Sequence, residues 1–312
     1  MGKAVVLYNP YAGSGRGTEE SQKLKDILKD TELQFFDVTK ITDYVSFWKE
    51  IPGEWDVILS GGDGTLNHFI NDAGALDSSR KIYYYASGSG NDFLHDIGRK
   101  KGDAPVLINR YLENLPEVMV DGKTCRFLNG IGYGIDGYCC EVGDAQRLKS
   151  DKPVNYTAIA IKGLLFHYKP TSAVITVDGV KHTYKKVWLA PTMNGRFYGG
   201  GFNPVPEAEP DDGLLDVLIV EKVNLLQVAG VIGKYQKGHY ADYPHLIRHV
   251  RCHTVRVECE QENVVNVDGE AVYTTDAKIE VVPHAIRFFY PKGLSYHAKN
   301  SQSGHKFAEI TP

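Results

Sequence analysis

The sequence predicts two domains of different fold class: an N-terminal, Rossmann-like α/β domain built on a parallel sheet, and a C-terminal β-sandwich domain. Over roughly the first 100 residues, short apolar segments alternate with segments of helical spacing. This alternation is typical of βαβ units around a parallel sheet. From about residue 116, short strand-like segments follow one another between Gly, Pro and Asp turns, which favours an antiparallel sandwich or a barrel-like domain.

The predicted first domain, residues 1–115, contains candidate strands separated by helical segments. The strands are runs of five or six mostly apolar residues: Ala4–Tyr8, Leu33–Val38, Trp55–Ser60 and Ile82–Ala86. The helical segments are Glu19–Lys29, Thr42–Glu50 and Thr65–Asn71. Ligands of parallel sheets collect at the carboxyl ends of the strands, and glycine-rich turns follow three of these ends, at Tyr8, Ser60 and Ala86.

The predicted second domain, residues 116–290, is rich in strands. The candidate strands are Ser172–Val177, Lys185–Ala190, Leu214–Val220, His253–Cys259, Val264–Val267, Lys278–Val282 and Ile286–Tyr290. Two helical segments interrupt them, Val154–Tyr168 and Asn224–Tyr235. We expect the end of the chain to return to the first domain, and we assign the segment at about 291–312 to it.

Composition argues against several classes of protein. The formal net charge of −4 argues against nucleic acid as a partner, since nucleic-acid-binding domains are usually strongly basic. The five cysteines show no C-x-x-C spacing, so neither a disulfide framework nor a zinc site is indicated. The sequence shows no signal-peptide core and no run of about 18 apolar residues. We therefore expect a cytoplasmic protein.

The strongest local feature is the loop Ser60-Gly61-Gly62-Asp63-Gly64-Thr65-Leu66-Asn67, between a candidate strand and a candidate helix. Glycines let the backbone approach a ligand closely, and the N–H groups at the helix N-terminus favour a polyanion. A carboxylate beside a phosphate is repulsive unless a metal ion lies between them or the carboxylate orients a donor. The alternative is a plain strand–turn–helix connection in which Asp63 or Thr65 caps the helix.

Two companion loops favour the ligand-binding interpretation. Asn9-Pro10-Tyr11-Ala12-Gly13-Ser14-Gly15 follows the first strand, and Ser87-Gly88-Ser89-Gly90-Asn91-Asp92 follows the fourth. The first loop is not a Walker A loop, because no Gly-Lys-Ser/Thr follows, and it is not a dinucleotide-binding G-x-G-x-x-G motif. Three small-residue loops at the same edge of one parallel sheet would line one crevice.

Together these loops resemble those of the diacylglycerol kinase catalytic domain family, the lipid kinases that include bacterial diacylglycerol kinases and sphingosine kinases. The family elements N-P-x-[SA]-G-x-G, G-G-D-G-T-x-N and G-[ST]-x-N-D match Asn9–Gly15, Gly61–Asn67 and Gly88–Asp92, in order. The middle element is shared with NAD kinases and phosphofructokinases, whereas the set of three is specific. The resemblance covers about residues 3–292 and implies a fold like that of NAD kinases and diacylglycerol kinases.

The resemblance also implies that ATP binds between the two domains. The residues that it assigns to the phosphates or to the rest of the nucleotide pocket are Asn9, Thr39, Ser60, Gly61, Gly62, Asp63, Gly64, Thr65, Leu66, Asn67 and Ser89. Many family members carry Glu directly after G-G-D-G-T-x-N, whereas this chain has His68. Any role of that Glu in handling substrate or metal therefore does not transfer.

An acidic turn, Glu209-Pro210-Asp211-Asp212-Gly213-Leu214, precedes a candidate strand of the second domain. It is interpreted either as a simple Asp-Gly turn or as a hard-cation site, because carboxylates and backbone carbonyls in a tight turn suit Mg²⁺. The family's D-G-x-L-D element is associated with a structural Mg²⁺. By resemblance the ligands here would be Asp212, Glu209 and the backbone of Leu214, with Asp216 in support.

A second acidic element, Val267-Asp268-Gly269-Glu270, is interpreted either as a hairpin turn or as the source of a general base. A hydroxyl group is a poor nucleophile, and a positioned carboxylate can take its proton as the bond to phosphorus forms. In the family this D-G-E element closes over the cleft opposite the nucleotide. We assign Glu270 as the base and Asp268 to positioning a metal ion or water.

The leading hypothesis is an ATP- and Mg²⁺-dependent lipid kinase, with diacylglycerol as acceptor and phosphatidic acid as product. Such an enzyme would meet its lipid at a membrane surface as a transient peripheral protein, and a homodimer is left open. The segment Lys162–Lys169 could touch an anionic membrane or be an ordinary helix with a solvated face. The alternatives are an NAD kinase or another soluble-metabolite kinase, and a nucleotide-binding regulatory protein without transfer activity.

Overall fold

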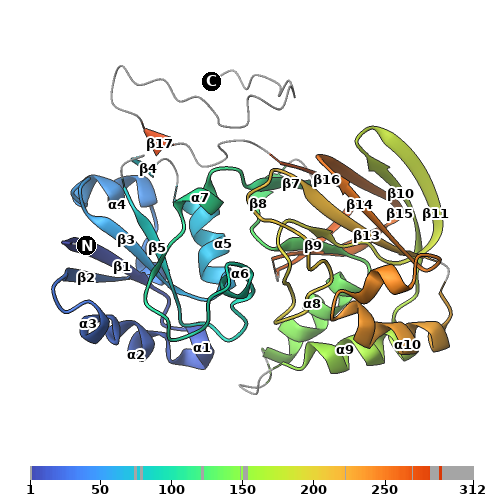
Figure 1. The fold of residues 1–312 in the computed structure, drawn as a ribbon, viewed down its shortest axis with the longest axis horizontal. Coiled ribbons are helices and arrows are strands. Elements are labelled where there is room, and N and C mark those ends of the chain that lie inside the picture. The colour runs from blue at the N-terminus through green and yellow to red at the C-terminus, as the bar shows by residue number, and fades with distance from the viewer. Residues whose placement is uncertain are drawn as a thin grey trace.

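The computed structural model describes residues 2–73, 76–77, 80–120, 123–147, 149, 154–221, 223–268, 270–281 and 288–289. Figure 1 shows an α/β domain formed by the N-terminal part of the chain beside a β-rich domain formed by the rest. The predicted fold class is therefore confirmed. Among the described residues, no helix is long and apolar enough to cross a membrane.

The first domain is built on a sheet with the strand order β2-β1-β3-β5-β6. Its strands are β1 (Lys3–Tyr8), β2 (Glu32–Asp37), β3 (Asp56–Gly61), β5 (Ile82–Ala86) and β6 (Val106–Leu107). The first four pair in parallel, and β6 adds an antiparallel edge. The carboxyl ends of β1, β3 and β5 therefore lie next to one another, as the alternating sequence pattern predicts.

Helices cover both faces of this sheet because the strands are apolar on both faces. Val5 and Leu7 of β1 join the core that includes Phe69, whereas Val6 joins a second core with Leu24. The helical segments are α1 (Ala12–Gly15), α2 (Gly17–Gln22), α3 (Leu24–Ile27), η1 (Val38–Lys40), α4 (Tyr44–Glu50), α5 (Asp63–Asp72), α6 (Asp92–Asp96) and α7 (Asn109–Leu112). The predicted helix Glu19–Lys29 is divided at Lys23 into α2 and α3.

The second domain is a ten-stranded antiparallel sheet. Its strands are β7 (Pro116–Val120), β8 (Lys123–Arg126), β9 (Gly130–Tyr133), β10 (Thr171–Val177), β11 (Val180–Leu189), β12 (Thr192–Met193), β13 (Leu215–Glu221), β14 (Ile247–Cys252), β15 (Thr254–Val267) and β16 (Glu270–Val281). The order runs β10-β11-β13-β12-β9-β15-β16-β7-β8, and β10 also pairs with β15. This additional pairing closes part of the sheet on itself around an apolar interior.

Helical segments pack on the outside of the closed part of this sheet. They are α8 (Ile135–Arg147), α9 (Tyr156–Lys162), the π-helical turn η2 (Gly163–His167), α10 (Leu225–Tyr235) and the 3₁₀ turn η3 (His239–Asp242). Strand β13 serves two cores because its side chains alternate: Val217 points into the sheet interior, whereas Leu218 packs with the helices.

Several elements of the second domain differ from the prediction. The predicted strands His253–Cys259 and Val264–Val267 are one long strand, β15, with a register irregularity between Glu258 and Asn263. The predicted helix Val154–Tyr168 is α-helical only to Lys162 and continues as the π-helical turn. Helix α8 was not predicted at all.

The end of the described chain pairs with the first half. Strand β17 (Phe288–Phe289) lies parallel to β4 (Leu76–Asp77). The segment 291–312, which we assigned to the first domain, lies outside the described residues.

Candidate active site

The three glycine-rich loops meet at the carboxyl edge of the parallel sheet. A Cβ atom added to Gly88 would lie 2.4 Å from the Cα atom of Gly62, so the second and third loops touch backbone to backbone. Gly13 has a φ of +57°, and a Cβ atom there would lie 2.4 Å from the carbonyl oxygen of Ser87. Only glycine permits both contacts, and the loops form one continuous surface.

The first and second loops are linked by a side-chain hydrogen bond. The Nδ2 group of Asn9 donates to Oγ1 of Thr65 at 3.1 Å, and the Asn9 side chain also accepts the N–H of Tyr11 at 3.0 Å. Thr65 in turn packs on Gly61, where a Cβ atom would come within 2.3 Å of the threonine side chain. The two predicted nucleotide-pocket residues Asn9 and Thr65 are therefore brought together.

Asp63 holds the third loop rather than capping its own helix. Its carboxylate accepts the backbone N–H groups of Asp92 at 2.9 Å and Phe93 at 3.0 Å, which are the first residues of α6. The preceding residue, Asn91, has a left-handed backbone with a φ of 57°. Of the two roles weighed for this carboxylate, orienting a donor is visible in the structure, and the donors are backbone groups.

Helix α6 forms a junction between the two domains. The carboxylate of Asp92 accepts the N–H groups of Gly200 and Gly201, each at 2.7 Å. Burial, and next the charge of Asp63, raises the pKa of Asp92 to about 7. One turn later the Asp96 carboxylate accepts the N–H and Nε of Arg196. The guanidinium of Arg196 is therefore engaged by Asp96.

Asp268 lies at the centre of a second junction. It has a left-handed backbone with a φ of 46°, and its carboxylate accepts the backbone N–H groups of Leu128, Asn129 and Gly130 at 2.7–3.0 Å. Asn67 of the G-G-D-G-T-x-N element donates to the same carboxylate at 3.0 Å. Burial raises the pKa of Asp268 to about 6, although these hydrogen bonds act in the opposite direction.

These contacts place the Asp268-Gly-Glu270 element against the second glycine-rich loop. Asn67 and Asp268 are 201 residues apart in the chain, and their hydrogen bond joins α5 to the end of β15. Glu270 begins β16 and pairs with Val267. The side chain of Glu270 lies outside the described residues, so its assignment as the base stays a prediction. The positioning role assigned to Asp268 would have to act through a carboxylate that already accepts four N–H groups.

The predicted Mg²⁺ turn is held by an arginine. The Asp212 carboxylate accepts the N–H of Leu214 at 2.8 Å and is paired with the guanidinium of Arg251. Glu209 is exposed and contributes its carbonyl oxygen to the N–H of Asp212. Among the described residues, no group of three or more His, Cys, Asp or Glu side chains could hold a metal ion. The turn is formed as predicted, but its carboxylate is neutralised by a side chain.

The remaining predicted pocket residues differ in accessibility. Ser89 and Gly64 are exposed at the loop surface. Ser60 is buried, and its carbonyl oxygen accepts the N–H of Asn9. Leu66 is fully buried in the apolar core, and its N–H donates to the carbonyl of Gly62. The structure therefore places the Leu66 side chain away from the loop surface, because a leucine in the first turn of α5 faces the sheet.

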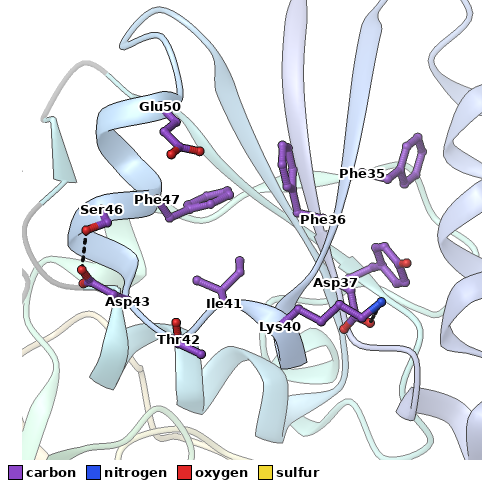
Figure 2. Close-up of a pocket in the computed structure, with 11 residues that line it drawn as sticks. Phe35, Phe36, Asp37, Lys40, Ile41, Thr42, Asp43, Ser46, Phe47 and Glu50 are labelled. Carbon is purple, nitrogen blue, oxygen red and sulfur yellow. Dashed lines mark hydrogen bonds and ion pairs between the residues drawn. The ribbon is translucent and has the colours of Figure 1, made fainter.

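Thr39 lies at the carboxyl end of β2, where its N–H and hydroxyl both donate to Asp37. A depression of about 510 Å³ beside this strand is lined by Asp37, Lys40 and aromatic side chains that include Phe36 and Phe47. Figure 2 shows these side chains. None of the glycine-loop residues lines it. It is therefore a feature of the sheet edge near Thr39 and not of the loop surface.

Lys101 is a residue at the loops that sequence reasoning missed. Its ammonium group donates to the carbonyl oxygens of Ser87 at 3.2 Å and Gly88 at 3.1 Å. It also lies 3.7 Å from the position of a Cβ atom on Gly13. In the sequence it belongs to the run Arg99-Lys100-Lys101, which has the pattern of a solvated basic surface. Nothing in that pattern distinguishes Lys101 from its neighbours.

Comparison with known proteins agrees with this geometry. The diacylglycerol kinase catalytic domain model matches residues 3–120, and the YegS C-terminal NAD kinase beta sandwich-like domain model matches residues 129–290. The chain belongs to the family of the second model, which spans more than half of its length, and it carries a diacylglycerol kinase catalytic domain over residues 3–120. The first model spans all three glycine-rich loops, and the second spans Asp212, Asp268 and Glu270.

Relatives of this family match nearly the whole chain. A diacylglycerol kinase of Mycobacterium tuberculosis is 24% identical over 306 residues, covering 94% of this chain and 96% of the relative. A diacylglycerol kinase of Bacillus subtilis is 26% identical over 283 residues, covering 86% and 90%. A crystal structure described as a diacylglycerol kinase from Bacillus anthracis str. Sterne superposes with a TM-score of 0.64 at 22% identity, covering 93% of this chain and 97% of that one. The resemblance predicted from the loops is confirmed, and the family is one of lipid kinases.

Proposed function

We propose that the protein transfers the γ-phosphoryl group of ATP to a lipid hydroxyl, with diacylglycerol as the acceptor and phosphatidic acid as the product. The observation that carries this proposal is the convergence of three glycine-rich loops at one sheet edge, joined through Asn67 to the Asp268 element. In a chain of this family, that arrangement supports a phosphate site facing an acceptor site.

The phosphate chain would lie over the second loop, at the N-terminus of α5. Gly62 precedes this ten-residue helix, and backbone N–H groups at such a position favour negative charge. At the close Gly62–Gly88 contact no side chain separates the second loop from the third. Asn9 and Thr65 would fix the wall of the pocket, and Thr39 and Ser89 would lie nearer the nucleoside.

Two carboxylates lie beside the loops, those of Asp63 and the buried Asp92, and each also accepts two backbone N–H groups. Their neighbouring negative charges would favour a Mg²⁺ ion that accompanies the nucleotide. Asp63 and Asp92 carry like charge close enough for Asp63 to raise the pKa of Asp92. Protein sites for Mg²⁺ often consist of one or two carboxylates together with substrate phosphates. We propose these two residues as its protein ligands. When bound, the ion would neutralise charge on the β- and γ-phosphoryl oxygens.

The acidic turn at Asp212 fits a structural Mg²⁺ less well. Arg251 already supplies a positive charge to that carboxylate, which also accepts the N–H of Leu214. We therefore base no step of the reaction on this turn.

The chemistry asks the protein mainly for alignment and charge neutralisation. We propose that Glu270 accepts the proton of the attacking hydroxyl while that oxygen forms its bond to the γ-phosphorus and ADP leaves. Asp268 would position this segment by holding the Leu128–Gly130 backbone and Asn67. The acceptor would approach from the membrane, so the proposal includes a transient peripheral association with the bilayer.

Thin-layer chromatography of lipids after incubation with γ-labelled ATP and Mg²⁺ tests this proposal. The panel would contain diacylglycerol, a sphingoid base and phosphatidylglycerol, with NAD as the soluble acceptor. We expect label in phosphatidic acid. Label in phosphorylated NAD would favour the NAD kinase alternative, and ATP binding with no transfer to any acceptor would favour a regulatory protein.

A further inference from the structure

An exposed apolar protrusion lies on the second domain, at the π-helical turn η2 that follows α9. The side chain of Phe166 is 76% exposed, and those of Ile161 and Leu165 are each 41% exposed. Large apolar side chains scattered singly over a surface need no explanation, but three that cluster within six residues indicate a contact site. We call these three residues the Phe166 protrusion.

The protrusion is held out by a rigid base. Gly163 packs so closely on Tyr138 that a Cβ atom would lie 2.6 Å from its ring, and Leu164 is buried beneath. The wider i→i+5 turn that begins there carries Leu165 and Phe166 to the surface. Their exposure is therefore fixed by the packing of their neighbours.

A shallow groove of about 350 Å³ lies at the foot of the protrusion. Its apolar lining comes from three separate segments, which include Trp188 and Val223. The indole N–H of Trp188 donates to the Val223 carbonyl at 3.0 Å, so these two segments are held together. Lys169 and Lys186 also line it. The site is thus apolar at its centre and basic at its rim.

Four exposed lysines belong to the segments that form the protrusion and its groove: Lys169 and Lys186, which line the groove, Lys162, which follows Ile161, and Lys185, which precedes Lys186. Within the part of the chain that the structure describes, none of the four forms an ion pair. This local excess of positive charge stands out in a chain whose formal net charge is −4. Apolar side chains ringed by lysines match the boundary between acyl chains and anionic headgroups.

Helix α9, which carries Ile161 and leads into the π-helical turn, lies on the same side of the molecule as α1 of the first glycine-rich loop. Figure 1 shows α9 on the lower side together with α1, which belongs to the first loop, whereas α4 lies on the upper side. A bilayer that met the protrusion would therefore lie on the side of the molecule where α1 and the first glycine-rich loop lie.

We propose that the Phe166 protrusion and its four lysines are the surface on which the protein docks to a bilayer that contains anionic lipid. Phe166 and Leu165 enter the headgroup region, and the lysines contact the anionic headgroups. Only the purpose of the docking, which is to deliver a lipid acceptor, rests on the proposed function.

Sedimentation with phosphatidylcholine vesicles, with and without phosphatidylglycerol, tests the surface without using activity. We expect the wild type to bind the phosphatidylglycerol vesicles more tightly. Phe166→Ser and the double variant Lys185→Gln/Lys186→Gln should each weaken that binding by about tenfold. The matched controls are Val45→Ser and Lys49→Gln on α4, whose side chains are also exposed, and they should bind as the wild type does.

A second measurement does not depend on loss of binding. In a Phe166→Trp variant, the indole emission should shift to shorter wavelength when phosphatidylglycerol vesicles are added, beyond any shift of the wild type. No added shift, or unchanged vesicle binding by Phe166→Ser, would overturn the proposal. So would a dimer in light scattering that Phe166→Ser dissociates while vesicle binding is retained.

The two proposals fail differently. Vesicle binding that depends on Phe166, with no transfer to any lipid, would support the docking surface and reject the lipid kinase proposal. Phosphorylation of a short-chain, water-soluble diacylglycerol, with vesicle binding that does not depend on Phe166, would support the lipid kinase proposal and reject the docking surface.

Discussion

Single carboxylates in this molecule hold backbone segments that are distant in sequence. Asp268 accepts N–H groups from residues 138–140 positions away, and also the side-chain amide of Asn67. A buried N–H group that loses its acceptor costs about 1–3 kcal/mol. The positions of these carboxylates, and not only their charge, therefore determine how the loops are arranged.

Asp268→Ala should lower the free energy of unfolding by about 3 kcal/mol, because it leaves four donors unpaired in a buried place. Urea denaturation measures the change. Asp178→Ala is a matched control, since Asp178 also has a left-handed backbone, with a φ of 44°, and caps the N–H groups of His253 and Thr254 at an exposed turn. An equal loss in both variants would contradict the special importance of the Asn67–Asp268 junction.

Lys101→Met should raise the KM for ATP by about tenfold and change kcat less, because the ammonium group supplies positive charge beside the loops that we propose hold the phosphates. Steady-state kinetics at varied ATP concentration separate the two constants. Lys100→Met, one residue away and exposed, should leave both unchanged. If the two variants behave alike, Lys101 has no role in nucleotide binding.

Asp136 makes stability depend on pH. Burial raises its pKa to about 7, and its Oδ1 accepts the hydroxyl of Tyr198. Its Oδ2 is buried without a hydrogen-bond partner among the described residues. The folded-state pKa of Asp136 lies above its unfolded value. The contribution of Asp136 to the free energy of unfolding is therefore most favourable below about pH 4, and this favourable contribution is lost as the pH rises through about 7.

Asp136→Asn should therefore stabilise the protein, relative to the wild type, by roughly 2 kcal/mol more at about pH 8 than at about pH 5. Any cost of the amide itself is the same at both pH values. Asp92 and Asp268 also have raised pKa values, but they are present in both proteins and cancel in the difference. Urea unfolding of the pair at the two pH values checks the sign, and parallel stability profiles would contradict it.

At the scale of elements, the loops depend on glycine contacts more than on their own turns. Gly88→Ala would place a methyl group 2.4 Å from the Gly62 Cα atom, where only backbone could move aside. We expect ATP affinity to fall at least about tenfold as the loops separate, measured by calorimetry. Gly233→Ala on α10, where a Cβ atom meets nothing within 4 Å, should bind ATP normally.

The main strands of the first domain were predictable from sequence because each carries a strong local pattern, whereas the short elements α1, α6, β6 and α7 were not predicted. The four predicted strands correspond to β1, β2, β3 and β5. Helix α8 was missed because Gly137, Gly143 and the pair Cys139-Cys140 obscure its helical pattern. Gly143 is required there by tertiary packing, since a Cβ atom would lie 2.7 Å from the ring of Tyr156.

The sequence predicted which residues belong to the candidate site, but not which groups those residues contact. The sequence motifs indicated Asp63, Asn67 and Asp268, yet the groups that they bind lie on other elements. Asp63 meets the start of α6, and Asp268 meets the Leu128–Gly130 backbone. Such contacts depend on tertiary folding, and a single sequence carries no local signal for them. The same holds for Arg251, 39 residues from Asp212.

On the scale of the whole molecule, the two domains are joined around the loops by hydrogen bonds to carboxylates. Asp92 and Asp96 of the first domain accept N–H groups of the 196–201 segment, and Asp268 of the second domain accepts Asn67. The glycine-rich loops therefore face the second domain directly. A lipid hydroxyl brought to this junction would meet a phosphate chain held on the opposite side.

The most direct test of this account is a single-turnover measurement of label transfer from γ-labelled ATP to diacylglycerol, with the wild type compared with Glu270→Gln. We expect labelled phosphatidic acid from the wild type. For Glu270→Gln we expect unchanged ATP affinity and a transfer rate lower by about a hundredfold or more. Transfer at the wild-type rate by Glu270→Gln, or label that reaches only water or NAD, would contradict it.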